Sequence, residues 1–254
     1  MRIVDFSEKN LIDLVRPCIS EPETFQFKKG APFRIDWIKK NFKRGYGAKL
    51  LYDRRRPVGF IDYLPIEYTP DPVEGKDIFF LNCIYVQRAY WRKGYGRMLI
   101  LAMEDEAKKK KKGVGLLAWD HPHWFMPASY FLNLGYEEAT RRGKEVLLWK
   151  RLTQIKPPYF IEGNYKHQLI PGKLLVEAFF SGRCPHNSVI IERVKKVCKE
   201  FDDEVEFREI STEDFQVAKK LGISFGNFFN GKRKLWGVPT EQEIRREVRS
   251  MLNK

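Results

Sequence analysis

Cysteine is scarce in this sequence, with four residues among 254: Cys18, Cys83, Cys184 and Cys198. No two of them stand in a CxxC arrangement, so the spacing typical of zinc sites and dithiol redox centres is absent. Scattered cysteines are also too few for a disulfide framework, which is a feature of oxidising compartments. We therefore expect reduced thiols, no metal site and a cytoplasmic protein.

Long apolar runs are also missing. A membrane-spanning helix needs about 18 or more consecutive apolar residues, and no stretch of that kind occurs. The first ten residues, MRIVDFSEKN, have no apolar core after a basic start, so they do not resemble a signal peptide. The sequence predicts neither export nor a membrane partner.

Acidic residues are in the minority, with 33 against 47 lysines and arginines, a net charge of +14. Residues 1–153 hold 29 basic and 19 acidic residues, so most of the excess lies there. Such a field favours an anionic ligand, for example a cofactor with several phosphates. Nucleic acid is an alternative that we do not favour. The basic run Lys108–Lys112 ends a predicted helix, where cations oppose the negative dipole end, and no aromatic residues interleave it.

What is abundant is apolar and aromatic sequence, at 43% and 14%, which suffices for a folded core. In the first part, strand-like and helix-like periodicities alternate. The expected strands cover 2–6, 48–52, 58–64, 78–86 and 114–119, with a closing hairpin at 137–141 and 145–150. The expected helices cover 11–19, 32–42, 96–111 and 127–134.

Residues 154–172 contain three prolines and two glycines among polar residues, which is typical of a linker. A second pattern follows, with strands at 174–180, 205–210, 224–229 and 232–236. Helices are expected at 185–200, 212–221 and 240–252, and Thr240 with Glu243 forms a capping box for the last one. We predict an α/β protein with domains at 1–153 and 173–254 that are joined by the linker.

The strongest functional signal is the segment LNCIYVQRAYWRKGYGRMLILAMEDEA. An apolar strand runs into a basic loop, and Gly94-Tyr95-Gly96 then opens a helix. Glycines allow a loop to fold back so that its N–H groups converge on an anion. The start of a helix adds unpaired N–H groups and the positive end of the dipole. This arrangement suits a pyrophosphate.

The segment resembles the [QR]xxGx[GA] signature of the GNAT acetyltransferases, with Trp91 where Gln or Arg is usual. A second family pattern, YxxxGF, is similar to SYFLNLGYEEA, which ends in Gly135-Tyr136. The resemblance implies a mixed sheet flanked by helices and acetyl-CoA as co-substrate. It further implies that Ile84, Tyr85 and Val86 line the pantetheine, and that Arg92, Lys93, Gly94, Tyr95, Gly96 and Arg97 cradle the pyrophosphate.

The residues that usually move protons in this family are missing. The strand positions where a glutamate is expected hold Phe80 and Asn82, and the tyrosine position of the short helix holds Phe131, next to Tyr130. The nearest substitutes are Asp120, His121 and His123, after the fifth strand, since histidine suits proton transfer near neutral pH. We expect Asp120 or His121 to contribute more than Tyr130. Ordinary loop hydrogen bonding is the alternative for each of them. Cys83, on the fourth strand, is a candidate acyl acceptor, and a core position is the alternative for this residue.

The second part resembles a degenerate thioredoxin-like unit of the kind found in bacterial and archaeal proteins with a YoaP-like C-terminal domain. Cys184 stands at an expected helix start, after Arg183 and before Pro185 and His186. A helix N-terminus and nearby cations lower a thiol pKa, which predicts a partly exposed, reactive monothiol. The usual partner position holds Asn187, so dithiol exchange is not supported. Packing at a helix start is the alternative.

We therefore predict an acetyl-CoA-dependent N-acetyltransferase in which a primary amine, either a small molecule or a protein amine, attacks the thioester directly. One alternative is a non-catalytic acyl-CoA-binding or sensing module. The other is a monothiol module that acts through Cys184. The sequence leaves the acceptor and the oligomeric state open.

Overall fold

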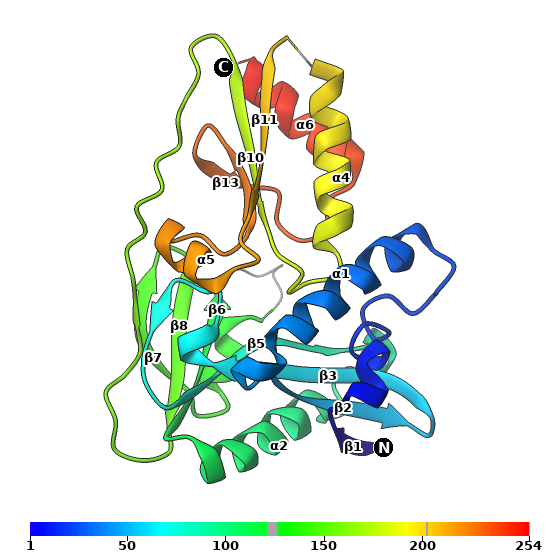
Figure 1. Cartoon of the computed structure of the whole chain (residues 1–254), viewed down its shortest axis with the longest axis vertical. Helices are drawn as coiled ribbons and strands as arrows, with labels where there is room; N and C mark the ends of the chain where they lie inside the picture. Colours follow the sequence, from blue (N-terminus) through cyan, green and yellow to red (C-terminus); the bar gives the residue numbers. More distant parts are fainter. Residues whose placement is uncertain (121–125, 202, 254) are drawn as a thin grey trace.

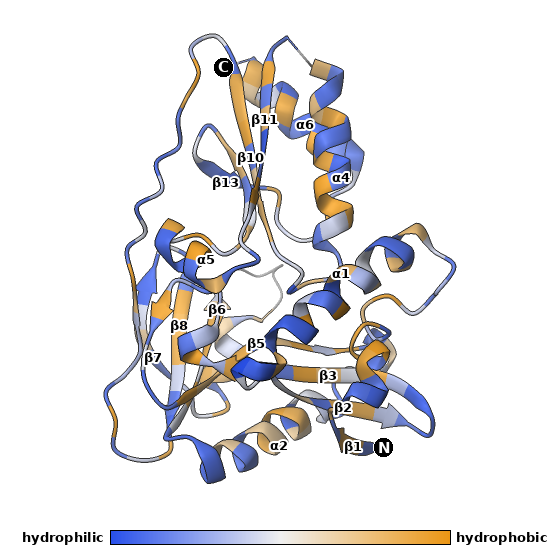
Figure 2. Cartoon of the chain, viewed as in Figure 1, coloured by the Kyte–Doolittle hydropathy of each residue, from blue (hydrophilic) through white to orange (hydrophobic). Residues whose placement is uncertain are grey.

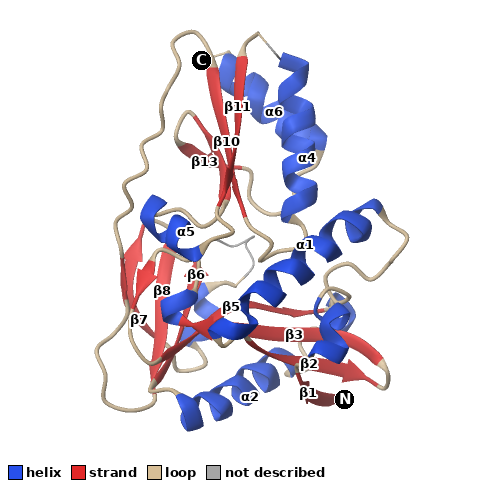
Figure 3. Cartoon of the chain, in the orientation of Figure 1, coloured by secondary structure: helices blue, strands red, loops and turns tan. Residues whose placement is uncertain are grey.

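The computed structural model describes residues 1–120, 126–201 and 203–253. Its strands form a seven-stranded sheet, a four-stranded sheet and a two-stranded pair, and Figure 3 shows helices packed around both larger sheets. The seven-stranded sheet comes from residues before 152 and has the order β1-β2-β3-β5-β6-β8-β7. This is the mixed α/β sheet flanked by helices that the sequence predicts.

The strands of the large sheet follow the predicted periodicity closely. They are β1 (Arg2–Asp5), β2 (Gly47–Asp53), β3 (Arg56–Pro65), β5 (Ile78–Val86), β6 (Gly113–Trp119), β7 (Glu137–Arg142) and β8 (Glu145–Arg151). Only β5 and β6 pair in parallel, and the other neighbours are antiparallel. A parallel pair needs a crossover, which α2 (Tyr95–Lys110) supplies between these strands.

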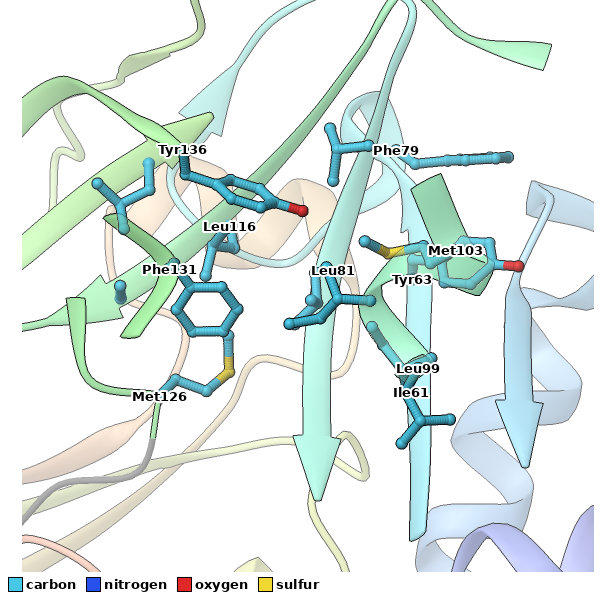
Figure 4. Packing of buried hydrophobic residues seen from close by; sticks show 14 of the residues in the cluster. Ile61, Tyr63, Phe79, Leu81, Leu99, Met103, Leu116, Met126, Phe131 and Tyr136 are labelled. Atoms are coloured by element: carbon cyan, nitrogen blue, oxygen red, sulfur yellow. The ribbon is translucent and has the colours of Figure 1, made fainter. Parts of the chain in front are cut away.

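Helices cover both faces of this sheet because its central strands are apolar on both sides. On one face, Ile61 and Tyr63 pack against Leu99 and Met103 of α2, as Figure 4 shows. On the opposite face lie α1 (Phe25–Asn41) and the 3-10 helix η1 (Glu8–Leu14). Figure 1 places α1 and α2 on opposite sides of β2 and β3. The short α3 (Ala128–Leu132) completes the core beside β8.

Two helix predictions differ from the structure. Helix α1 begins at Phe25 rather than at Pro32, because the Thr24 hydroxyl accepts the Phe27 N–H at 3.2 Å and caps an earlier turn. Pro32 then lies inside the helix, where its missing N–H removes one bond. The helix expected over 11–19 is instead the 3-10 helix η1, followed by turns.

The four-stranded sheet has the order β11-β10-β12-β13 and comes from residues 174–234. Its strands are β10 (Leu174–Phe180), β11 (Val205–Ser211), β12 (Gly226–Phe229) and β13 (Lys232–Lys234). The helices are α4 (Asn187–Cys198), α5 (Phe215–Leu221) and α6 (Glu241–Leu252), with Thr240 and Glu243 in the predicted capping box. Apolar residues gather along β10 and one face of α4 (Figure 2), where α6 closes a second core.

The segment from Thr153 to Gly172 connects the two sheets along one side of the molecule (Figure 1). Its short strand β9 (Tyr159–Phe160) pairs with β4 (Val73–Glu74), which lies in the connection between β3 and β5. The expected linker therefore contains an ordered part. The remaining elements are 3-10 turns: η2 (Phe42–Arg44), η3 (Ile66–Tyr68), η4 (Arg88–Tyr90) and η5 (Lys199–Phe201).

The second part of the chain docks on the face of the large sheet that α1 occupies. A Cβ atom built at Gly182 would lie 2.5 Å from the Phe33 carbonyl oxygen, so only glycine permits this approach to α1. Lys219 of α5 donates to the carbonyl oxygens of Ile66 and Glu67 at 3.1 and 3.2 Å. The two sheets are thus held together by close packing and hydrogen bonds. Within the described ranges, no helix is long and apolar enough to cross a membrane.

Candidate functional site

The central feature is a separation of β5 from β6. The two strands pair only over Ile78–Leu81 and Gly113–Leu116, although β5 continues to Val86 and β6 to Trp119. Cys83, Ile84 and Tyr85 are only half-buried, despite lying in the middle of the sheet. The separation therefore leaves the backbone edge of β5 unpaired with β6 beyond Leu81, and this stretch includes Ile84, Tyr85 and Val86.

A β-bulge lies at the point where the strands part. Asp62 of β3 pairs with Cys83 and Tyr63 pairs with Leu81, so Asn82 has no opposite residue on β3. Bulges bend a strand and redirect backbone groups, and they are common next to active sites. Here the bulge turns β5 away from β6 and marks the inner end of the separation.

The basic loop after β5 forms the outer end. Arg92 has φ 59° and Gly94 has φ 79°, and Gly94 is the N-cap of α2. Two left-handed residues in three positions turn the chain sharply into α2, whose first N–H groups lack intrahelical partners. Arg92, Lys93 and Arg97 are exposed around them. This part of the chain suits a diphosphate, as the glycine pattern predicts.

Trp91 stabilises the loop in place of the usual Gln or Arg. Its indole Nε1 donates to the Val86 carbonyl oxygen at 2.5 Å, and the Arg88 guanidinium lies 5.7 Å from its ring centroid. Trp91, which departs from the family pattern, therefore attaches the loop to the end of β5.

Tyr130 and Phe131 of α3 have different surroundings. Phe131 is fully buried, and in Figure 4 it lies with Met126 on one side of Leu81. The Tyr130 hydroxyl lies 2.8 Å from the position that a Cβ of Gly96 would take, which places it against the first turn of α2. Burial raises the pKa of Tyr130. The structure thus directs the Tyr130 hydroxyl to the start of α2.

Asp120 follows β6 and is largely exposed. Its carboxylate forms an ion pair with Arg141 at 2.7 Å, and its N–H donates to the Lys144 carbonyl oxygen at 2.9 Å. These contacts link the end of β6 to the β7–β8 hairpin and favour a structural role. His121 and His123, the other proton-transfer candidates, lie outside the described residues.

A buried polar network lies on the α1 face beside the bulge. Arg34 forms an ion pair with Asp62, and the Tyr46 hydroxyl donates to Asp62 Oδ2 at 2.8 Å. Burial disfavours the Arg34 cation, but the negative charge of Asp62 outweighs it and raises the pKa of Arg34. Arg34 also donates to the Arg183 carbonyl oxygen and so links this network to the second part. In the sequence, the only sign of this network is Asp62, an aspartate within an apolar strand.

A second polar cluster comprises Thr69, Asp71, Asn82 and Arg183. Arg183 donates through Nη1 to Asp71 Oδ2 at 2.6 Å and through Nη2 to the Asn82 carbonyl oxygen at 2.7 Å. The Thr69 hydroxyl lies 3.3 Å from Asp71 Oδ2 and 3.5 Å from Asn82 Oδ1. Sequence reasoning missed this cluster, which joins the bulge to the second part of the chain.

Cys18, Cys83 and Cys184 lie near one another on the same face, and the direction expected for the pKa of Cys184 is wrong. Cys184 is half-buried, and burial raises its pKa, although the backbone N–H groups of His186 and Asn187 and the charges of Arg34 and Arg183 act in the opposite direction. Burial also lowers the pKa of His186, which therefore adds less positive charge than expected. Burial likewise raises the pKa of Cys18 and Cys83.

A hollow of about 420 Å³ lies next to the start of the loop. It is lined by Arg16, Ser20, Pro22, Arg55, Arg56, Pro57 and Gln87. Its three arginines add to the positive field around the loop and favour the approach of an anionic ligand. In the part of the chain that the structure covers, no group of three His, Cys, Asp or Glu residues could hold a metal ion.

The chain is similar in sequence and in structure to several known proteins. The sequence profile of the Acetyltransferase (GNAT) family matches residues 10–136, half of the chain. The uncharacterized N-acetyltransferase YoaP of Bacillus subtilis is 22% identical over 222 residues, which cover 82% of this chain and 84% of YoaP. PH1933 from Pyrococcus horikoshii is 19% identical with a TM-score of 0.45, and covers 60% of this chain and 100% of its own. The aminoglycoside 6'-N-acetyltransferase from Enterococcus faecium is 17% identical, with a TM-score of 0.45 and coverage of 61% and 99%.

Proposed function

The chain belongs to the GNAT family of acetyltransferases, and from this premise we propose that it transfers the acetyl group of acetyl-CoA to a primary amine. The observation that carries the proposal is the separation of β5 from β6 beside a loop that ends in the N-terminus of α2. The unpaired edge of β5 offers backbone groups to the amides of a ligand. The loop at the outer end of this edge offers N–H groups to a diphosphate.

The chain's own residues fit acetyl-CoA group by group. The backbone of Ile84, Tyr85 and Val86 would bond to the pantetheine amides. The N–H groups from Arg92 to Arg97 would hold the diphosphate, because they combine the helix dipole with exposed basic side chains. The Tyr130 hydroxyl, next to Gly96, would add a hydrogen bond at this end. We therefore propose a binding role for Tyr130.

The acetyl group would lie at the bulge, where the strands part. There a backbone N–H of β5 would stabilise the oxyanion that forms when the amine attacks the thioester carbonyl. The amine must be deprotonated before attack, and the CoA thiolate must finally receive a proton. Phe131, at the position of the usual tyrosine, has no ionisable group and cannot supply that proton.

The acceptor would approach from the face opposite α2, since α2 and the phosphate loop occupy the cofactor side. The second part of the chain covers that face and approaches the bulge through Arg183. This arrangement favours a small-molecule amine over an amine on a folded protein, which would need an open surface.

The other predictions have weaker support. A non-catalytic acyl-CoA-binding module would need the same strand edge and loop, so only turnover separates it from an enzyme. A monothiol function of Cys184 is disfavoured, because its raised pKa leaves little thiolate at neutral pH. We further propose that residues 173–254 form a thioredoxin-like domain, supported by the parallel β10–β11 pair that α4 connects.

Turnover with a panel of primary amines tests the proposal. Release of the free CoA thiol should accompany acetylation of at least one amine, identified by a mass increase of one acetyl group. Calorimetric binding of acetyl-CoA without thiol release across the whole panel would support the non-catalytic module instead.

A further inference from the structure

Strand β5 lacks a carboxylate at the two positions where the family resemblance implies one, since these hold Phe80 and Asn82. The structure brings a carboxylate to the same place from another segment. Asp71, in the connection between β3 and β5, is completely buried and shares Thr69 and Arg183 as neighbours with Asn82. A carboxylate thus lies beside the bulge, although none lies on the strand.

Two atoms of this cluster have no partner among the described residues. They are Asp71 Oδ1 and Asn82 Nδ2, and the side chains that carry them are 0% and 1% exposed. Leaving a buried polar atom without a hydrogen bond costs about 1–3 kcal/mol, and more for a charged group. Two such atoms in neighbouring side chains mark a place where a polar ligand completes the bonding.

The charges define the ligand. Arg183 holds Asp71 Oδ2 and leaves Oδ1 free, so the carboxylate retains a lone pair for a second cationic donor. An ammonium group has three donors and suits that oxygen. The Asn82 amide can donate to an oxygen atom of the reacting groups. Arg183 comes from the second part of the chain, so both parts build this subsite.

We propose that Asp71 binds the ammonium group of the acceptor and accepts its proton, and that Arg183 is the positioning residue for Asp71. The proposal rests on the proposed function. One proton moves from the ammonium to the Asp71 carboxylate. The nitrogen lone pair then forms the C–N bond to the acetyl carbon. The C–S bond breaks, and its electron pair leaves on the CoA sulfur. The second proton lost by nitrogen neutralises that thiolate, and Asp71 returns its proton to water.

Asp71→Asn tests the proposal, because the amide keeps the shape and the hydrogen-bonding capacity toward Arg183 but cannot accept the proton. With an amine found by the thiol-release panel, kcat/KM for the amine should fall by about 10²–10⁴-fold. The Kd of acetyl-CoA should stay unchanged. Arg183→Lys should retain more activity than Arg183→Ala, because a single ammonium can still contact Asp71.

Glu145→Gln is the matched control. Glu145 and Arg233 form another ion pair between the two parts, at 2.9 Å, and a change there weakens the docking without altering the bulge. Glu145→Gln should lower the thermal stability at most and keep kcat/KM within a few-fold of wild type. The double variant Asp71→Asn/Arg183→Gln leaves no unpaired charge. If the single variant fails to fold, the double variant should still bind acetyl-CoA and remain slow.

Wild-type kcat/KM in Asp71→Asn would overturn the proposal, and so would an equal loss in Glu145→Gln. A wild-type protein that acetylates no amine contradicts the proposed function instead. In that case the same panel of amines is tested by thermal shift in the presence of CoA. Stabilisation of the wild type but not of Asp71→Asn supports the subsite, and equal or absent stabilisation of both overturns it.

Discussion

Gly94→Ala is the sharpest test of the phosphate loop. Gly94 has φ 79° and is exposed, and a Cβ atom built there meets no protein atom within 4 Å. Crowding in the protein therefore contributes nothing, and the effect of alanine comes from the backbone conformation. The left-handed region costs a non-glycine residue about 1–2 kcal/mol.

This cost should appear in binding rather than in stability. An exposed alanine with no neighbours can relax out of the left-handed region in the free protein, and the loop then no longer presents its N–H groups. Acetyl-CoA must restore the conformation, so its Kd should rise by about 5- to 30-fold, the equivalent of 1–2 kcal/mol. Isothermal calorimetry measures this change directly.

Gly172→Ala provides the matched control. Gly172 has φ 76° and also meets nothing within 4 Å, but it lies just before β10, away from the loop. Its replacement should leave the Kd of acetyl-CoA unchanged. Wild-type affinity in Gly94→Ala, or an equal loss of affinity in Gly172→Ala, would show that the loop conformation at Gly94 does not support acetyl-CoA binding.

Three further predictions follow from the remaining contacts. Tyr130→Phe should raise the Kd of acetyl-CoA by about 2- to 12-fold, which corresponds to the loss of one hydrogen bond. The variant should leave kcat unchanged. A hundred-fold loss of kcat in steady-state assays would instead make Tyr130 the proton donor. The rate of Cys184 alkylation by iodoacetamide should rise with pH, with a midpoint above the value of a free thiol, about 8.5, because burial raises the pKa of Cys184. Mass spectrometry measures the rate, and Cys184→Ser serves as the reference that lacks this thiol. Burial alone would raise the pKa of Glu106, but hydrogen bonds from Lys49, Lys110 and Tyr63 lower it from 4.5 to about 2. The stability that Glu106 contributes is therefore present above about pH 4.5 and lost as the pH falls toward 2; urea unfolding of wild type and Glu106→Gln should differ at pH 7 and converge at low pH.

The large sheet was predictable because its strands carry their own signals. Apolar runs bounded by glycine, proline or basic turns are local, and the helix after Gly94 follows from the sequence around it. The start of α1 was missed because Pro32 is usually found near the beginning of a helix, whereas the cap at Thr24 depends on a single hydroxyl. The β4–β9 pair joins segments about 85 residues apart, which no local pattern shows.

The candidate site likewise has one part with a local sequence signal and another part without one. The loop from Arg92 to Arg97 carries a local glycine pattern, and the family resemblance implies the role of the strand edge at Ile84. The cluster around Asp71 has no such signal, because Arg183 is 112 residues away in sequence and reaches it only through the docking of the second part. The pKa of Cys184 illustrates the same limit, since its helix-start position and Arg183 act as predicted, but burial in the docked structure outweighs them.

We propose that acetyl-CoA lies along β5, between the loop before α2 and the bulge at Asn82. A crystal structure of the complex with acetyl-CoA tests it most directly. We expect the diphosphate within hydrogen-bond distance of N–H groups between Arg92 and Arg97, the pantetheine along Ile84–Val86, and the acetyl group at the bulge on the side of Asp71. Acetyl-CoA bound elsewhere, or with its acetyl group turned away from β5, would contradict it.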